Sequence, residues 1–325
     1  MISNNLAETI LLSPLDTGAD TINIVASSAT PTMASWYLTT LHEKREQEKK
    51  QHKHTIPCVH INLVIGMTSM DGIPSSWHNE FKELHHCKQL ATIDDFSCSY
   101  VYEMPAVRSN LYVWTKEGNP TTAFMGSAPF CQDAFLPSTV EDIMEPVDPK
   151  ESLVFYDTIC NRSMFCTHAE IEENVRVKND DLTLTELSSQ TALEHVTLSL
   201  LTKDGTIGRK SGLNWGQRAH RNPNQAYIPV PIEIARKRFF PNEKQQFTVQ
   251  TDDHKSLILR LEQEKDKALT TPLSNSLLGE YFRRRLGVGN GDFVTEEDLY
   301  RYGRTDVTFT KIDEEQFYMD FSRPC

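Results

Sequence analysis

Apolar runs and amphipathic stretches alternate along the first half of the chain. Residues 21–28 alternate apolar and polar positions, whereas residues 59–66 form a continuous apolar run of the length typical of a buried strand. Residues 31–50 begin with a proline and carry apolar positions at helical spacing before the stretch becomes heavily charged. A further helix is predicted over 75–90 and a strand over 96–102. This order of elements predicts an α/β domain with a mixed sheet and flanking helices.

A β-hairpin is predicted next, in residues 108–130. Two runs of β-prone residues are separated by a turn at 117–120, where Gly and Pro interrupt the pattern, and the second run ends in Gly126-Ser127. A helix predicted over 151–160 closes this half of the chain.

The pattern changes in the second half. Short apolar runs separated by loops predict strands over 195–201, 226–230, 246–251 and 257–261. One clear helical segment is predicted among them, at 276–286, so this half is expected to be a mostly β pseudobarrel. The acidic stretch 167–181 lacks a strong periodicity and is the predicted linker. The expected domains are therefore 1–166 and 182–325.

The net charge of −12 is spread unevenly over the 325 residues. Residues 1–200 carry 13 Lys and Arg against 27 Asp and Glu, a net of −14, which leaves 20 against 18 in residues 201–325, a net of +2. A basic surface for nucleic acid can therefore lie on the second half although the whole chain is acidic.

The seven cysteines are an odd number, scattered through a long chain, which favours reduced thiols over a disulfide framework. No apolar run approaches the roughly 20 residues that a membrane span needs, and the first residues lack the pattern of a secretory signal. We therefore expect a cytoplasmic protein that does not contact a membrane.

Two basic clusters interrupt the second half. The first contains Arg209, Lys210, Arg218 and Arg221 with no acid among them, and the second ends in three consecutive arginines, 283–285. Two exposed charged loops would give the same pattern, but the interleaved Asn, Gln, Ser and Trp are the residue types that contact bases and phosphates. The residues predicted to contact DNA are Arg209, Lys210, Ser211, Asn214, Trp215, Gln217, Arg218, Arg221, Asn222, Asn224, Ser274, Asn275, Ser276, Arg283, Arg284 and Arg285.

Several segments of this half resemble the C-terminal domain of the NgoFVII/NgoAVII-type restriction endonucleases. They are the stretches 211–218, 224–229, 251–253, 275–283 and 302–305. The resemblance implies a B3-like pseudobarrel that grips a short double-stranded DNA site with two arms, formed by 209–221 and 274–285. Asp252 and Asp253 are interpreted as turn residues, and Tyr227 and Phe282 as core residues.

The hairpin of the first half resembles the single catalytic motif of the phospholipase-D-like nucleases in the same family. In that motif a His-x-Lys precedes a Gly-Ser-x-Asn. Here Arg108 stands at the His position, Asn110 at the Lys position and Pro129 at the Asn position, while Ser127 is kept and Glu141 matches the family's acidic residue.

The resemblance implies a nuclease chemistry that uses no metal or other cofactor. One motif per chain implies a twofold homodimer with one composite site, and the family also implies a possible separate ATPase or helicase subunit. Arg108 has no lone pair to attack phosphorus, Asn110 removes a cation, and Pro129 lacks an amide. The chain is therefore interpreted as a sequence-specific DNA-binding protein with lost or severely impaired cleavage.

Two alternatives stay open. The chain could be a working endonuclease with another nucleophile, such as His86 or Cys131, or a partner that dimerises with an active homologue without contacting DNA. His86 belongs to a His-x-Lys, but the predicted helix 75–90 carries it. Cys160, Cys166 and His168 lack the paired spacing of a zinc site, and His52, His54 and His60 are interpreted as surface and core residues.

Overall fold

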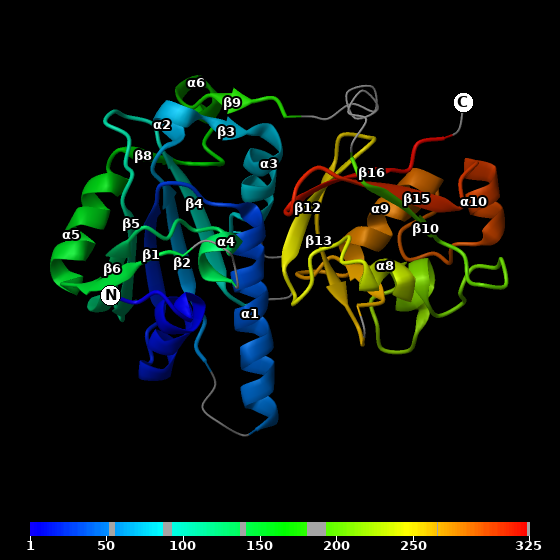
Figure 1. Cartoon of the computed structure of the whole chain (residues 1–325), viewed down its shortest axis with the longest axis horizontal. Coiled ribbons are helices and arrows are strands. Elements are labelled where there is room, and N and C mark those ends of the chain that lie inside the picture. Colours follow the sequence, from blue (N-terminus) through cyan, green and yellow to red (C-terminus); the bar gives the residue numbers. More distant parts are fainter. Residues whose placement is uncertain (52–55, 87–92, 137–140, 181–192, 265, 324–325) are drawn as a thin grey trace. The chain divides into compact units, whose positions relative to one another are not determined.

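The computed structural model describes residues 1–51, 56–86, 93–136, 141–180, 193–264 and 266–323. The chain divides into two compact units, Met1–Asp180 and Asp181–Cys325 (Figure 1). Each unit is built around one large sheet of seven strands. This confirms the predicted fold class, an α/β unit followed by a mostly β unit.

The sheet of the first unit has the strand order β7-β6-β5-β1-β2-β4-β8. Three neighbouring strands, β1 (Thr21–Ala26), β2 (His60–Ile65) and β4 (Asp95–Val101), run parallel to one another. The outer strands are antiparallel to their inner neighbours; they are β5 (Asn110–Lys116), β6 (Asn119–Gly126), β7 (Met144–Val147) and β8 (Ser163–Phe165). The mixed sheet therefore places the carboxyl ends of β1, β2 and β4 on one edge.

Helices cover both faces of this sheet, with α1 (Pro31–Lys50) and α3 (Ser75–Leu84) on one side and α5 (Pro149–Cys160) on the other (Figure 1). The Thr30 side chain caps α1 by accepting a hydrogen bond from the Met33 amide, and Pro31 occupies the first helical position. Tyr156 and Ile159 of α5 pack on apolar side chains of the sheet. Shorter elements of this unit are η1 (Ala7–Leu12), η2 (Ser13–Thr17), α2 (Thr68–Asp71), β3 (Ile73–Pro74) and α4 (Gln132–Phe135).

The segment predicted as a linker is folded into the first unit as far as Asp180. It carries α6 (Ile171–Asn174) and β9 (Val177–Lys178), and β9 pairs with β3. The Asp180 carboxylate accepts hydrogen bonds from the hydroxyls of Ser75 and Ser76 at the start of α3. The sequence pattern did not predict these contacts, because they join positions about a hundred residues apart in the chain.

The sheet of the second unit is nearly closed, with the order β10-β15-β16-β12-β13-β14-β11. Its strands are β10 (His195–Ser199), β11 (Ile228–Pro229), β12 (Gln246–Thr251), β13 (Ser256–Glu262), β14 (Ala268–Thr270), β15 (Asp306–Lys311) and β16 (Gln316–Asp320). The helical elements are η3 (Gly212–Gln217), α8 (Ile232–Arg236), α9 (Ser276–Leu286) and α10 (Glu296–Tyr302). The predicted helix 276–286 coincides with α9, whereas α8 and α10 were not predicted.

No helix in the described ranges combines the length and apolarity that crossing a bilayer requires.

Candidate functional site

The hairpin motif lies where β5 begins and β6 ends. Asn110 opens β5 and faces Gly126, the last residue of β6. A Cβ atom on Gly126 would lie 2.0 Å from the carbonyl oxygen of Ile143, so the close approach of the chain before β7 requires glycine here. The motif is therefore held beside the carboxyl end of β1, where Ser27 follows the strand.

Asn110 is a buried cross-link rather than an open ligand. Its Oδ1 accepts hydrogen bonds from the Ser27 amide at 2.8 Å and the Ser27 hydroxyl at 3.0 Å. Its Nδ2 donates to the carbonyl oxygens of Ser127 at 2.8 Å and Gly126 at 3.3 Å. The amide thus joins the end of β1 to the end of β6, and it places no positive charge at this position.

Ser127 is bound to the segment that leads into β7. Its hydroxyl donates to Asp142 Oδ1 at 2.6 Å and accepts from the Ile143 amide at 3.0 Å. The carboxylate that meets the motif serine is therefore that of Asp142, while Glu141, the predicted acid, is exposed. The two acids are adjacent in the sequence, and only the path of the chain distinguishes them.

Arg108 and Pro129 flank this cross-link. Arg108 is exposed, just before β5. The Pro129 carbonyl accepts from the Cys131 amide, and the next residue, Phe130, exchanges backbone hydrogen bonds with Ser28 and Thr30. The loop after β6 is thereby fixed against the turn that leads into α1.

His86 and Cys131 lie in different places. His86 Nδ1 is 2.7 Å from Asp95 Oδ1, at the amino end of β4, and β4 runs parallel to β1. The motif lies beyond the carboxyl ends of these strands, so about six residues of strand, on the order of 20 Å, separate His86 from it. Cys131 lies on the motif loop itself, half-buried. Burial raises the pKa of the nearby Tyr112 hydroxyl, and the negative charges of Cys131 and Asp142 raise it further.

The weak zinc pattern is not assembled in the fold. Cys160 ends α5, whereas Cys166 is buried beside β4. Among the described residues no group of three or more His, Cys, Asp or Glu side chains is arranged to hold a metal ion. His52 and His54 lie outside the described residues. His60 is a surface residue, exposed at the start of β2 and 3.6 Å from Asp95.

The first basic cluster of the second unit is a surface loop around η3. The side chains of Arg209, Lys210, Arg218, Arg221 and Asn222 are exposed. The Arg221 guanidinium lies over the Trp215 ring at 4.1 Å from its centre, a cation–π contact that orients the arginine. These charges are available to a polyanion.

Three polar residues predicted to contact DNA instead build the inside of this loop. Asn214 is fully buried and exchanges two hydrogen bonds with the backbone of Val294, and Asn224 accepts from the Gly291 amide. Gln217 donates to the Gly291 carbonyl. The assignment of Asn214 and Asn224 to base contacts is corrected, because their amides are used within the fold.

The arginine run of α9 is also largely structural. Arg283 is fully buried and donates to the backbone carbonyls of Asp292, Gly279, Leu213 and Pro223. Its predicted contact with DNA is therefore wrong.

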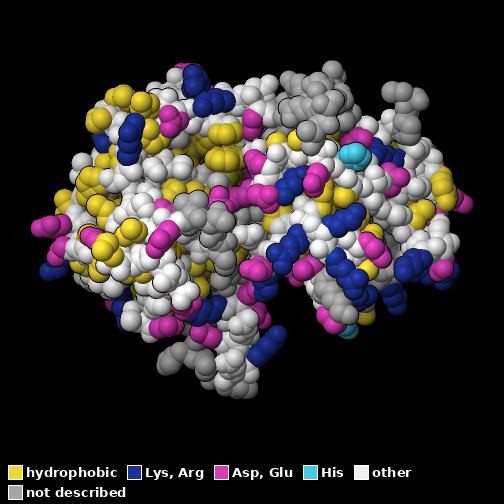
Figure 2. Space-filling model, viewed as in Figure 1, with side chains coloured by type: hydrophobic (Ala, Val, Ile, Leu, Met, Phe, Trp, Pro, Cys, Tyr) yellow, Lys and Arg dark blue, Asp and Glu magenta, His cyan; other side chains and the backbone are white. Residues whose placement is uncertain are grey.

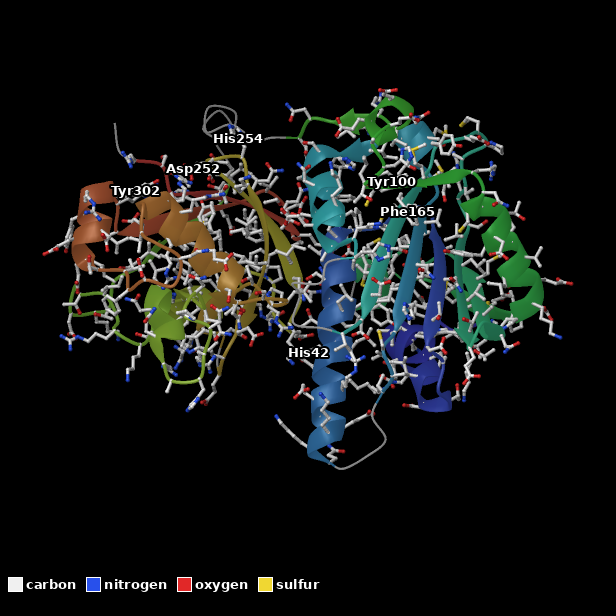
Figure 3. The ribbon with its side chains drawn as sticks, turned by 180° about the vertical axis from the view of Figure 1, so that it is seen from behind. His42, Tyr100, Phe165, Asp252, His254 and Tyr302 are labelled. Atoms are coloured by element: carbon white, nitrogen blue, oxygen red, sulfur yellow. The ribbon has the colours of Figure 1, made fainter. Side chains whose placement is uncertain are left out.

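Arg285 forms an ion pair with Asp252 and donates a hydrogen bond to the Tyr302 hydroxyl. Its side chain is only 12% exposed. Figure 3 shows Asp252 and Tyr302 near each other, at the β12–β13 turn and on α10. Arg284 is the exposed member of the run, with an ion pair to Asp253. Ser276 is buried, and Ser274, Asn275 and Trp215 are half-buried.

A third basic segment, which the sequence reasoning missed, lines a groove of about 1140 Å³ in the second unit. The groove is bounded by the loop after β10, by the chain around Ser211 and by α8, and its cations are Lys203, Arg236, Arg238 and Lys267. Figure 2 shows Lys and Arg side chains gathered over the part of this unit where Figure 1 draws α8. The signal was present in the sequence as three consecutive cations, residues 236–238.

Two family models match the chain, one for each unit. The model described as the NgoFVII restriction endonuclease N-terminal PLD domain matches residues 4–173, and the model described as the NgoFVII C-terminal B3-like DNA-binding domain matches residues 188–313. A search among curated proteins found no match.

Proposed function

Because the chain belongs to the NgoFVII restriction endonuclease family, we propose that it is a sequence-specific double-stranded DNA-binding protein whose phosphodiester cleavage is lost or severely impaired. The observation that carries the proposal is a contrast between the two units. The first uses the motif position of Asn110 as a structural cross-link, whereas the second keeps exposed cations along a groove.

The chemistry at the motif supports the loss of cleavage. An arginine at position 108 stays protonated and offers no lone pair for attack on phosphorus. The Asn110 amide is neutral and already holds four hydrogen bonds. The Asp142 carboxylate at the Ser127 hydroxyl adds a negative charge where an anionic phosphate would have to bind. Loss of a nucleophile commonly removes several orders of magnitude of rate acceleration.

The charge and shape of the second unit support binding to a duplex. Lys203, Arg236, Arg238 and Lys267 line the groove. Arg209 and Lys210 are exposed and stand in the sequence between Gly208 and Ser211, two residues that also line it. Cations of this kind bind phosphates and supply affinity, whereas Arg, Asn and carboxylate groups in the same groove can read base edges. Glu233 and Asp266, which also line the groove, are acceptors suited to an amino group of cytosine.

Binding is tested by substituting groove cations and measuring affinity at several salt concentrations. The variant K203A/R236A/R238A should bind a duplex selected from a random pool more weakly. The slope of log K against log salt should fall by about 0.9 for each phosphate contact removed. The matched control is R301A on α10. The Arg301 side chain is 68% exposed and lies outside the groove, so this variant should leave the affinity and the salt slope unchanged. Unchanged binding in the triple variant would show that the duplex is not bound in this groove, whereas a chain that retains no duplex from the pool would favour the partner that acts without DNA contact.

A working endonuclease is the second candidate, and one observation favours it: Cys131 is a nucleophilic residue on the motif loop. Cys131→Ser should then abolish any metal-independent cutting of the selected duplex. Cutting that persists in this variant would remove Cys131 from consideration. His86 is a weaker candidate because it binds Asp95 at the opposite edge of the sheet.

The assembly is part of the proposal. Since each chain has one motif, we propose a homodimer formed through the first unit, located in the cytoplasm, with an ATPase or helicase subunit as a possible additional partner. Sedimentation of the full chain with and without the duplex tests the homodimer directly. A monomer in both conditions would contradict it.

A further inference from the structure

Two buried thiols face each other across the edge of the first sheet. The register of β4 and β8 pairs Ser99 with Phe165, which sets Cys98 opposite Cys166. The Cys166 amide donates to the Cys98 carbonyl at 3.0 Å, both side chains are fully buried, and both thiols are free. Figure 3 labels Tyr100 and Phe165, which lie close together on these two strands.

An imidazole holds this pair in a fixed arrangement. His85 Nδ1 accepts a hydrogen bond from the Cys98 amide at 3.0 Å. The same side chain also hydrogen-bonds to Cys166. His85 is half-buried, and its ring contacts that of Phe165, which is 51% exposed. The half-buried imidazole therefore lies beside both cysteines.

The two cysteines differ in acidity. The hydrogen bond from Cys98 lowers the pKa of Cys166, and His85 and the charge of Lys82 lower it further, against the opposing effect of burial. Burial raises the pKa of Cys98, and the negative charge of Cys166 adds to that rise. Of the two thiols, Cys166 is therefore the one that loses its proton more readily and is the better nucleophile.

We propose that Cys98 and Cys166 form a modification site at which a peroxide converts the two thiols to a disulfide. The Cys166 thiolate attacks one peroxide oxygen, the O–O bond breaks, and the leaving hydroxide takes up a proton to become water. Cys98 sulfur then attacks the sulfenic acid sulfur, the S–O bond breaks, and the hydroxyl leaves as water with the Cys98 proton. Two electrons pass from the two sulfurs to the peroxide.

The disulfide would close a covalent loop between residues 98 and 166. The loop between residues 98 and 166 contains the β5–β6 hairpin with its motif, β7 and α5. Closing this loop restricts the unfolded chain and ties the edge strand β8 to β4. The inference concerns the first unit alone and does not depend on DNA binding.

Hydrogen peroxide and the full chain suffice for the test. After treatment, blocking of free thiols and digestion without reductant, the 98-to-166 linked peptide should dominate, its mass lower by two hydrogens, and dithiothreitol should reverse it. The oxidised chain should show a higher unfolding temperature. Oxidation confined to Cys58 or Cys160, or modification of Cys98 and Cys166 without a link, would overturn the proposal.

Variants separate the roles of the two sulfurs. Cys98→Ser should accumulate a dimedone-reactive sulfenic acid at residue 166, because no thiol remains to resolve it, whereas the matched control Cys160→Ser should form the disulfide as the unsubstituted chain does. Loss of the dimedone signal in folded Cys98→Ser would contradict the assignment. If that variant does not fold, the peptide map of the unsubstituted chain decides.

Discussion

At the scale of single residues, side chains that look functional in the sequence are used to build the fold. Asn110 stands at a predicted position of the catalytic motif, yet both ends of its amide are satisfied by Ser27 and by the backbone after β6. Arg283 belongs to a basic run, yet its guanidinium is satisfied by backbone carbonyls. Both residues can be tested as structural elements.

Asn110→Ala should lower the free energy of unfolding of the first unit by about 1–3 kcal/mol, because the Ser27 amide and two carbonyls lose their partner in a buried place. Asn119→Ala on the same hairpin is the control, since this exposed side chain makes only a long hydrogen bond to Glu117, and it should change stability by no more than about 0.5 kcal/mol. Equal effects in urea unfolding would contradict the cross-link.

Arg283→Ala should destabilise the second unit by at least about 2 kcal/mol, because buried carbonyls lose charged donors. The neighbouring Arg284→Ala, which removes a side chain that is 55% exposed, should cost no more than about 1 kcal/mol. Hydrogen exchange of peptides from residues 212–225 and 287–294 reports the difference. If Arg284→Ala is the more damaging, the buried role of Arg283 is wrong.

At the scale of elements, one buried ion pair joins α1 to the strands it covers. Arg45 Nη2 lies 2.6 Å from Asp94 Oδ1, and the same guanidinium donates to the carbonyls of Ile56 and Pro57 before β2. Asp94 also accepts from the Val59 amide. The pair therefore fixes the long helix against the entrance to β2 and β4.

Asp94→Ala should destabilise the first unit by about 3–5 kcal/mol, since it leaves the Arg45 charge buried without its partner. Lys44→Ala removes the preceding cation, whose partner Asp16 is 63% exposed, and should cost less than about 1 kcal/mol. Chemical denaturation of the full chain measures both, and a small loss for Asp94→Ala would show that the pair does not hold the helix.

Carboxylates at the ends of strands in the second unit make its stability depend on pH. Although partial burial opposes the effect, hydrogen bonds from Thr251 and the charges of Arg285 and Arg284 lower the pKa of Asp253. Hydrogen bonds from Ser322 and Arg304 likewise lower the pKa of Asp320. A folded-state pKa below the unfolded value gives stability that is present above that value and is lost as pH falls.

The second unit should therefore lose stability as pH falls below about 4, the ordinary aspartate range. Asp320→Asn should weaken the dependence of the second unit's stability on pH, measured by hydrogen exchange at about pH 5 and at pH values below about 4. Asp313→Asn on the exposed β15–β16 turn is the control variant. An identical pH profile in Asp320→Asn and the unsubstituted chain would contradict the assignment.

The sequence predicts elements better than it predicts what their side chains do. Helix 276–286 was found because its apolar spacing ends at Gly287, whose positive φ of 70° closes the helix. The burial of Arg283 was missed although it shares a helical face with Gly279 and Leu286, a signal that the run of three arginines obscured. The groove could not be predicted, because it is assembled from loops, α8 and the turn before β14, which the closure of the sheet brings together.

At the scale of the whole molecule, the two units carry separate capacities. The first has a mixed sheet with the β5–β6 hairpin, and its predicted motif positions are filled by an exposed arginine, a buried amide and a proline. The second presents a cation-lined groove on a barrel-like sheet. Retention of sequence-specific binding without cutting is the central claim that unites them.

The most direct measurement follows the fate of one bound duplex. An end-labelled duplex, selected by the chain from a random pool, is incubated with excess protein in EDTA and then analysed on native and denaturing gels. We expect a sequence-dependent complex on the native gel and full-length strands on the denaturing gel. Discrete fragments from the unaltered chain in EDTA would contradict this expectation.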